Sequence, residues 1–206
     1  MDSQVVVRQI VLQYDNETKE QFNKSLNNVT SINKLTELEN RNNYIINTLN
    51  QLRTEKNKIL VLSDRIAQLK TLKFGFDKLV NSNLLSCKTY LFTASNYNQN
   101  SDNELENSNI IFATYNLVAE GIFIKNLYTI VLASPKVQVT RNLNVALRNV
   151  EYGDYLTNAL IVDFVDELSI FKKLTIGRQQ TFLIQKCFLH TFEPMMMSFI
   201  EENQTI

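Results

Sequence analysis

The sequence predicts an α/β protein built on a mainly parallel central sheet with helices on both faces. Two short apolar runs rich in β-branched residues, Asn109–Ala113 and Tyr128–Ala133, are bounded by polar residues or proline. This pattern is typical of strands that are buried on both faces of a parallel sheet. A helical spacing of apolar residues, Val139, Leu143 and Leu147, follows the second run. Strands alternating with helices indicate a layered α/β architecture.

The same reasoning places the remaining elements along the chain. Further strands are expected at Val5–Tyr14, Lys58–Leu62, Lys88–Phe92, Ala159–Val165 and Phe188–Phe192. Helices are expected at Glu17–Leu26, Glu39–Thr54, after Ser63-Asp64, and at Leu168–Gln185. Two polar segments without periodicity, Asn27–Asn33 and Ser95–Asn107, predict loops.

Composition limits the classes of function. The 206 residues suit one domain, and 21 basic residues balance 21 acidic ones. The chain therefore lacks a broad cationic field, which argues against an independent binder of nucleic acid. No apolar run approaches the ~18 residues of a membrane span, so we expect a soluble intracellular protein without membrane contact. The high asparagine content suits an AT-rich genome such as that of a large DNA virus.

Metal binding is not expected. Cys87 and Cys187 are isolated cysteines, and His190 is the single histidine. A zinc site needs about four closely arranged ligands, and this chain offers no such spacing. We expect both thiols to be packing residues in a reducing compartment.

Four segments carry a resemblance to a known family. They read KILVLSDRIAQL at residues 58–69, ATYNLVAEGI at 113–122, TIVLASPK at 129–136 and ALIVDFVDELSIF at 159–171. In this order they resemble motif IV, motif V, the strand before motif VI and the closing strand and helix of the second RecA-like domain of superfamily 2 helicases. The nearest likeness is to helicases of large cytoplasmic DNA viruses, the poxvirus-type transcription helicase among them.

The resemblance covers roughly residues 5 to 190 and implies a three-layer RecA-like domain over residues 1–190. Residues 191–206 would form a Met-rich C-terminal tail. If the protein is viral, the host cytoplasm or the virion is its expected location.

A nucleic-acid contact is implied at the ends of two strands. Ser63, Asp64 and Arg65 match motif IV, and Thr114 opens the motif V segment. Helix capping explains Ser63 or Asp64 about equally well. Arg65 stands beside the expected helix start and is the better candidate for phosphate or partner contact.

A nucleotide contact is implied by Glu120-Gly121 and by Arg148, which stands where the family places an arginine finger. The glycine allows positive φ or a close approach to a ligand. Two positions depart from the family pattern, because Phe123 replaces the aspartate of motif V and Val145 replaces an arginine of motif VI. Loss of an arginine finger can reduce the rate by roughly 10³ to 10⁵.

The chain has four glycines and no G-x-x-x-x-G-K-[ST] phosphate cradle, and no suitable DExx box follows a strand. We therefore expect no autonomous ATPase, with ATP and Mg²⁺ bound only when a separate P-loop half completes the site.

Two hypotheses stay open. The chain is either the C-terminal half of a two-part helicase acting on DNA or RNA, or a catalytically inactive interaction module.

Three other features receive structural interpretations. Asp163 and Asp166 at the end of a strand are expected to cap the following helix rather than to act as catalysts. Glu39–Asn42 resembles the E-x-R-N of the viral helicases, and an exposed first helical turn explains it equally well. Lys172, Lys173 and Arg178 suit either the basic, aromatic final helix of that group or a solvated charged face.

Overall fold

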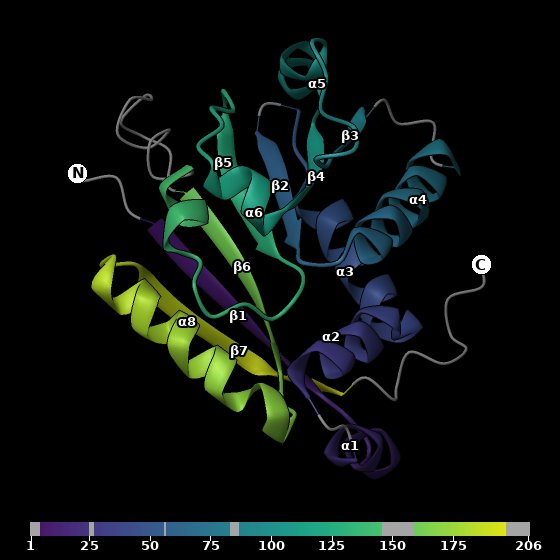
Figure 1. Ribbon diagram of the computed structural model, residues 1–206, viewed down its shortest axis with the longest axis vertical. Helices are drawn as coiled ribbons and strands as arrows, with labels where there is room; N and C mark the ends of the chain where they lie inside the picture. Colours follow the sequence, from purple (N-terminus) through teal and green to yellow (C-terminus); the bar gives the residue numbers. More distant parts are fainter. Residues whose placement is uncertain (1–4, 25–26, 56, 83–86, 146–158, 197–206) are drawn as a thin grey trace.

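Seven strands, all parallel, form one central sheet in the order β3-β4-β2-β5-β6-β1-β7 (Figure 1). The computed structural model describes residues 5–24, 27–55, 57–82, 87–145 and 159–196. The strands are β1 (Val5–Gln13), β2 (Lys58–Ser63), β3 (Thr89–Phe92), β4 (Ile110–Thr114), β5 (Leu127–Leu132), β6 (Ala159–Asp166) and β7 (Phe188–Met196). The predicted α/β class is confirmed.

Helices cover both faces of the sheet. They are α1 (Asn16–Asn23), α2 (Asn28–Glu37), α3 (Glu39–Leu52), α4 (Ile66–Ser82), α5 (Ser101–Asn107), α6 (Tyr115–Ala119), the 3-10 helix η1 (Ser169–Phe171) and α8 (Lys172–Ile184). Residues 140–145 are also helical.

Two apolar cores, one on each face, explain why the strand sequences are almost continuously hydrophobic. In β2, Ile59 and Val61 pack against α1–α4, whereas Leu60 and Leu62 pack on the opposite face, which α5, α6, residues 140–145 and α8 cover. All four side chains are at most 1% exposed. Burial of each such side chain contributes roughly 1.5–3 kcal/mol. The result is the predicted three-layer arrangement.

The loop predicted at Asn27–Asn33 is wrong, because α2 begins at Asn28. Asn27 caps this helix, since its Oδ1 accepts a hydrogen bond from the backbone N–H of Thr30 at 2.9 Å. Ile32 and Leu35 bury one face against the core. Asparagine, serine and threonine surround the few apolar residues of this segment, so its helical spacing is not evident from the sequence.

The loop predicted at Ser95–Asn107 is wrong over its second half, where α5 forms. Asp102 and Glu104 lie in its first turn, where their negative charges interact favourably with the positive end of the helix dipole. Leu105, which is 5% exposed, anchors this short helix to the core.

The last strand continues past the predicted Phe188–Phe192 and reaches Met196. Residues 191–196 of the predicted Met-rich tail are therefore part of the sheet, and residues 197–206 lie outside the described residues.

A buried ion pair links α3 to the end of β6. Arg41 Nε and one terminal nitrogen donate to the two carboxylate oxygens of Asp166 at 2.7 and 2.9 Å, and both side chains are fully buried. The Tyr14 hydroxyl at the end of β1 donates to the same carboxylate. Burial, followed by the negative charge of Asp166, raises the pKa of Tyr14. The alternative of an exposed first turn for Glu39–Asn42 therefore holds for Glu39, which is exposed, and fails for Arg41 and Asn42, which are buried.

A second buried pair lies on the opposite face. Arg178 Nε of α8 donates to Asp163 Oδ1 at 2.8 Å, and Gln9 Nε2 donates to Asp163 Oδ2 at 2.9 Å. The expected capping role of Asp163 and Asp166 is wrong, because both carboxylates bind buried arginines instead. Arg178 is 1% exposed, so it does not belong to a solvated face.

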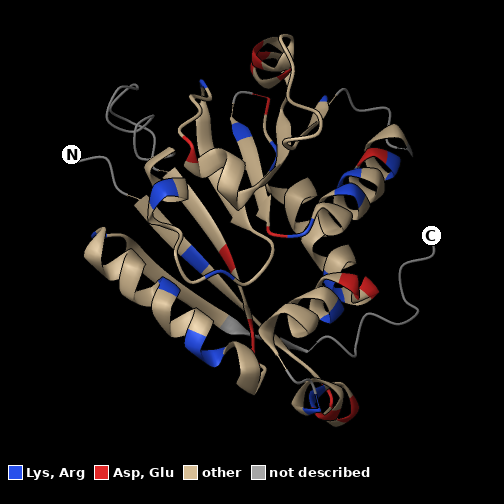
Figure 2. Ribbon diagram, in the orientation of Figure 1, with Lys and Arg blue, Asp and Glu red and all other residues tan. Residues whose placement is uncertain are grey.

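Basic and acidic residues are interspersed over the described elements, as Figure 2 shows, in keeping with the balanced composition. None of the described helices combines the length and the apolar character that a bilayer-spanning segment requires.

We predict that Arg41→Ala lowers the free energy of unfolding by about 3–5 kcal/mol, because the Asp166 carboxylate would remain buried without its partner. Urea denaturation monitored by circular dichroism measures this loss. Lys73→Ala is the control, since the Lys73–Asp77 pair is partly solvated and its removal costs at most about 1 kcal/mol. Equal losses in the two variants would contradict the role assigned to Arg41.

Candidate functional site

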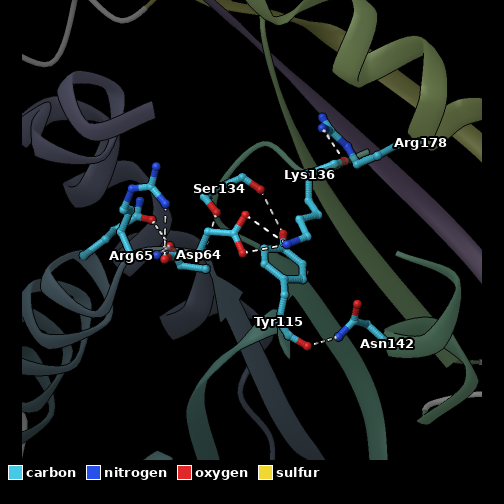
Figure 3. A network of polar contacts seen from close by, with 9 residues as sticks. Asp64, Arg65, Tyr115, Ser134, Lys136, Asn142 and Arg178 are labelled. Carbon is cyan, nitrogen blue, oxygen red and sulfur yellow. Dashed lines mark hydrogen bonds and ion pairs between the residues drawn. The ribbon is translucent and has the colours of Figure 1, made fainter. Parts of the chain in front are cut away.

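The carboxyl ends of the central strands bring the motif-like segments together (Figure 3). Asp64 follows β2, Thr114 ends β4, and Lys136 follows β5. Lys136 Nζ lies 2.9 and 3.2 Å from the two carboxylate oxygens of Asp64. The same ammonium lies 5.5 Å from the ring centroid of Tyr115, the first residue of α6. Segments far apart in the sequence thus form one polar cluster.

Ser134 connects these segments. The backbone N–H of Asp64 donates to Ser134 Oγ at 2.9 Å, and the Tyr115 hydroxyl donates to the Ser134 carbonyl at 2.8 Å. Asn142 Nδ2 then donates to the Tyr115 carbonyl at 2.7 Å, which ties the helical residues 140–145 to α6. Ser134 and Asn142 are each 2% exposed, so these bonds are shielded from water.

The turn at Ser134–Lys136 is also held from both faces of the sheet. On the α3 side, the Ala133 carbonyl accepts bonds from Arg41 at 2.8 Å and from Gln68 Nε2 at 3.3 Å. On the α8 side, the Lys136 carbonyl accepts a bond from Arg178 at 3.2 Å. The two buried arginines therefore fix the backbone on either side of this turn.

A pocket of about 470 Å³ opens beside the turn. It is lined by Tyr115, Asn116, Ala119, Lys136, Gln138, Thr140, Arg141 and Asn142. Its lining combines two cations with amide and hydroxyl groups, which are the donors that bind phosphate oxygens. The pocket lies between the segment that resembles motif V and the segment that resembles motif VI.

Burial raises the pKa of Tyr115 well above its ordinary value, with smaller opposing contributions from the charges of Arg178 and Asp163. The hydroxyl therefore remains protonated and serves as a hydrogen-bond donor to Ser134.

Among the described residues, no group of three or more His, Cys, Asp or Glu side chains is placed to hold a metal ion.

The predicted nucleic-acid residues lie at this edge. Ser63 is fully buried, and its hydroxyl donates to Gln68 Oε1 at 2.7 Å and accepts from the Arg65 N–H at 3.0 Å. Arg65 is half-buried, and its guanidinium donates to Asn33 Oδ1 of α2. Thr114 is half-buried at the end of β4.

The residues predicted to contact a nucleotide are less closely grouped than those predicted to contact nucleic acid. Glu120 and Gly121 are exposed and follow Ala119, the last residue of α6, which lines the pocket. Gly121 has φ of +100°, which is one of the two roles that the sequence allowed for it, and open space lies where a Cβ would be. Arg148 lies outside the described residues.

Sequence reasoning did not select Tyr115, Ser134, Lys136 and Asn142 as site residues. Lys136 served only as a landmark for aligning motif VI. The signal that identifies these residues is positional, because each follows or faces the carboxyl end of a fully apolar strand.

Comparisons with known proteins agree with this geometry. No protein-family model matches the chain. A protein of Acanthamoeba polyphaga mimivirus, named as an inferred ATP-dependent RNA helicase, is 25% identical over 156 residues, which are 75% of this chain and 29% of that protein. The chain therefore spans less than a third of this relative.

Solved structures share the fold at lower identity. T4 UvsW superposes with a TM-score of 0.74 at 21% identity, covering 94% of this chain and 42% of that one. Domain 2 of the DEAD-box helicase Mss116p, bound to an RNA duplex, gives 0.52 at 12% identity over 91% of this chain and 64% of that one. The Lhr helicase of Mycobacterium smegmatis, bound to single-stranded DNA and AMP-PNP, gives 0.53 at 12% identity over 93% of this chain and 23% of that one.

These observations confirm the resemblance found in the sequence. The fold is the RecA-like α/β fold that the chain shares with T4 UvsW and with domain 2 of the DEAD-box helicase Mss116p. The chain therefore shares a fold with helicase domains and is similar in sequence to a viral protein named as a helicase.

We predict that Tyr115→Phe lowers the free energy of unfolding by about 1 kcal/mol at pH 7, because the bond to the Ser134 carbonyl is lost. Above about pH 10 an unfolded tyrosine ionises while the buried Tyr115 keeps its proton, so wild-type stability falls as pH rises. The variant should lose less over that range. Urea titrations at pH 7 and pH 10.5 measure both effects.

Tyr97→Phe is the matched control, since Tyr97 is 62% exposed. Its free energy of unfolding at pH 7 should equal that of the wild type. A Tyr115→Phe variant with unaltered stability at pH 7 and an unaltered alkaline loss would contradict the assigned bond.

Proposed function

We propose that the chain is the C-terminal half of an ATP-dependent helicase and acts on nucleic acid together with a separate ATP-binding half. One observation supports this most strongly. Segments resembling motifs IV, V and VI meet at the carboxyl edge of the sheet, where Asp64, Tyr115, Ser134 and Lys136 bond to one another. Ligands of open α/β sheets bind at this edge.

Nucleic acid is the proposed ligand of Ser63, Asp64, Arg65 and Thr114. Arg65 precedes α4, whose first N–H groups favour anions, and its link to Asn33 orients the guanidinium on the surface. Mss116p domain 2 carries an RNA duplex and Lhr a DNA single strand, so both DNA and RNA are proposed ligands. The mimivirus relative carries the name of an ATP-dependent RNA helicase, and we extend the proposal to a role in viral transcription or replication.

ATP and Mg²⁺ are proposed to bind only at the junction with the other half. That half would supply the phosphate cradle that this chain lacks, whereas Glu120, Gly121 and Arg148 would approach the nucleotide from this side. The guanidinium of Arg148 is the proposed arginine finger. Arg141 lines the pocket and adds a second cation to this side.

A second candidate function is a catalytically inactive interaction module. Two positions favour it. Phe123, at the place of the family aspartate, is 65% exposed and has no group to accept a hydrogen bond from a ribose. Val145, at the place of a family arginine, is 3% exposed and belongs to the core.

Reconstitution of ATPase activity decides between the two functions. The purified chain alone should not hydrolyse ATP, and addition of a P-loop half that binds it should produce nucleic-acid-stimulated hydrolysis. Arg148→Ala should then lower kcat by about 10³-fold or more. Arg53→Ala is the control, because Arg53 follows α3 and precedes β2 at the amino edge of the sheet.

A verified complex without ATPase activity would reject the proposed helicase half and favour the interaction module. Equal rates for wild type and Arg148→Ala in an active complex would show that Arg148 is not the arginine finger. The proposed helicase half would then still stand.

A further inference from the structure

An exposed aromatic surface lies on the edge strand β7, away from the carboxyl-edge cluster. It consists of Arg8, Phe188, His190 and Phe192, and we call it the β7 platform. Phe188 is 55% exposed and Phe192 is 47% exposed. Large aromatic side chains left this open along one strand are a feature of binding surfaces rather than of a solvated edge.

The platform lies on the sheet face opposite α8. Cys187 and Leu189 pack into the core on the α8 side, so the alternating residues Phe188, His190 and Phe192 lie on the other face. Arg8 of β1 is in register with His190 on that face. Figure 1 shows β7 at the margin of the sheet with α8 alongside it.

The rings are held by one another and by the arginine. The ring centroids of Phe188 and His190 lie 4.8 Å apart at an interplanar angle of 64°. The guanidinium carbon of Arg8 lies 5.0 Å from the Phe192 centroid. Phe188 and Phe192 are four residues apart on the strand, so roughly 13 Å separates them and they present two separate surfaces along an extended line.

The chemistry of the platform fits an extended ligand with flat π-systems and negative charge. It offers aromatic faces, a guanidinium and an imidazole, and none of its four side chains is a carboxylate. Aromatic side chains on the open face of a sheet stack nucleobases, and each stacked base contributes binding without sequence preference.

We propose that the β7 platform binds the bases of single-stranded nucleic acid by stacking on Phe188 and Phe192, with Arg8 and His190 beside the backbone. This inference takes its ligand class from the proposed function but uses a surface separate from the carboxyl edge. Because the platform carries a single guanidinium, that of Arg8, the bases rather than the phosphates should supply most of the affinity. Binding should therefore depend only weakly on salt.

The test measures binding of the full chain to an oligothymidylate of about 12 nucleotides that contains one 2-aminopurine. Fluorescence anisotropy gives the Kd, and quenching of 2-aminopurine reports stacking. Phe188→Ala/Phe192→Ala should raise the Kd about 10-fold or more and remove the quenching. Phe188→Leu/Phe192→Leu should do the same while keeping apolar side chains on the strand, which separates stacking from a folding defect.

Phe74→Ala is the matched control. Phe74 is 66% exposed on α4 and also lies beside a cation, Lys78, at 5.3 Å. Its loss should leave the Kd unchanged. An abasic oligonucleotide of equal length should bind the wild type as weakly as the thymidylate binds the double variants.

Three results would overturn the proposal. They are an unchanged Kd in the double leucine variant, equal affinity for the abasic strand, or a wild-type dimer that the double variant disrupts without a change in Kd. The last result would mark the platform as a self-association surface. The ATPase reconstitution keeps Phe188 and Phe192 intact, so failure of the platform and failure of the helicase function are distinguishable.

Discussion

Two buried arginine–aspartate pairs on opposite faces of β6 are the interactions on which the carboxyl edge depends. Each arginine neutralises a carboxylate of β6 and donates a further hydrogen bond to the backbone that follows β5, Arg41 to the Ala133 carbonyl and Arg178 to the Lys136 carbonyl. A buried charge is tolerated when it is paired and its hydrogen bonds are satisfied. Here the pairing also fixes the backbone that bears Ser134 and Lys136. The same contacts that stabilise the fold therefore give the candidate site its shape.

The central strands β2, β4 and β5 could be predicted from the sequence because both faces of the sheet are covered there, so each of them is a short apolar run. Helices α2 and α5 could not, since asparagine, serine and acidic residues outnumber the few apolar side chains that anchor them, such as Leu35 and Leu105. The caps and buried contacts of these two helices depend on packing against the sheet, so they are evident only in the folded structure.

The site was predictable in position and less so in its contacts. Parallel topology brings Asp64, Thr114 and Lys136 to one edge, and the motif resemblance selected two of these three residues. The buried pairs were not predictable, because Arg41 lies 125 residues from Asp166 in the chain and nothing local indicates its burial. An arginine in a sequence is expected to be exposed, because arginine side chains are almost never fully buried unless they are paired. Tertiary packing overrides that expectation at Arg41 and Arg178.

Hydrogen–deuterium exchange on the complex of this chain with a P-loop half and an oligonucleotide measures whether nucleotide and nucleic acid meet the domain at its carboxyl edge, as we propose. Amides of residues 63–65, 114–121 and 134–142 should exchange more slowly in the complex than in the free chain. Unchanged exchange in all three segments, in a complex shown to be assembled, would contradict the account.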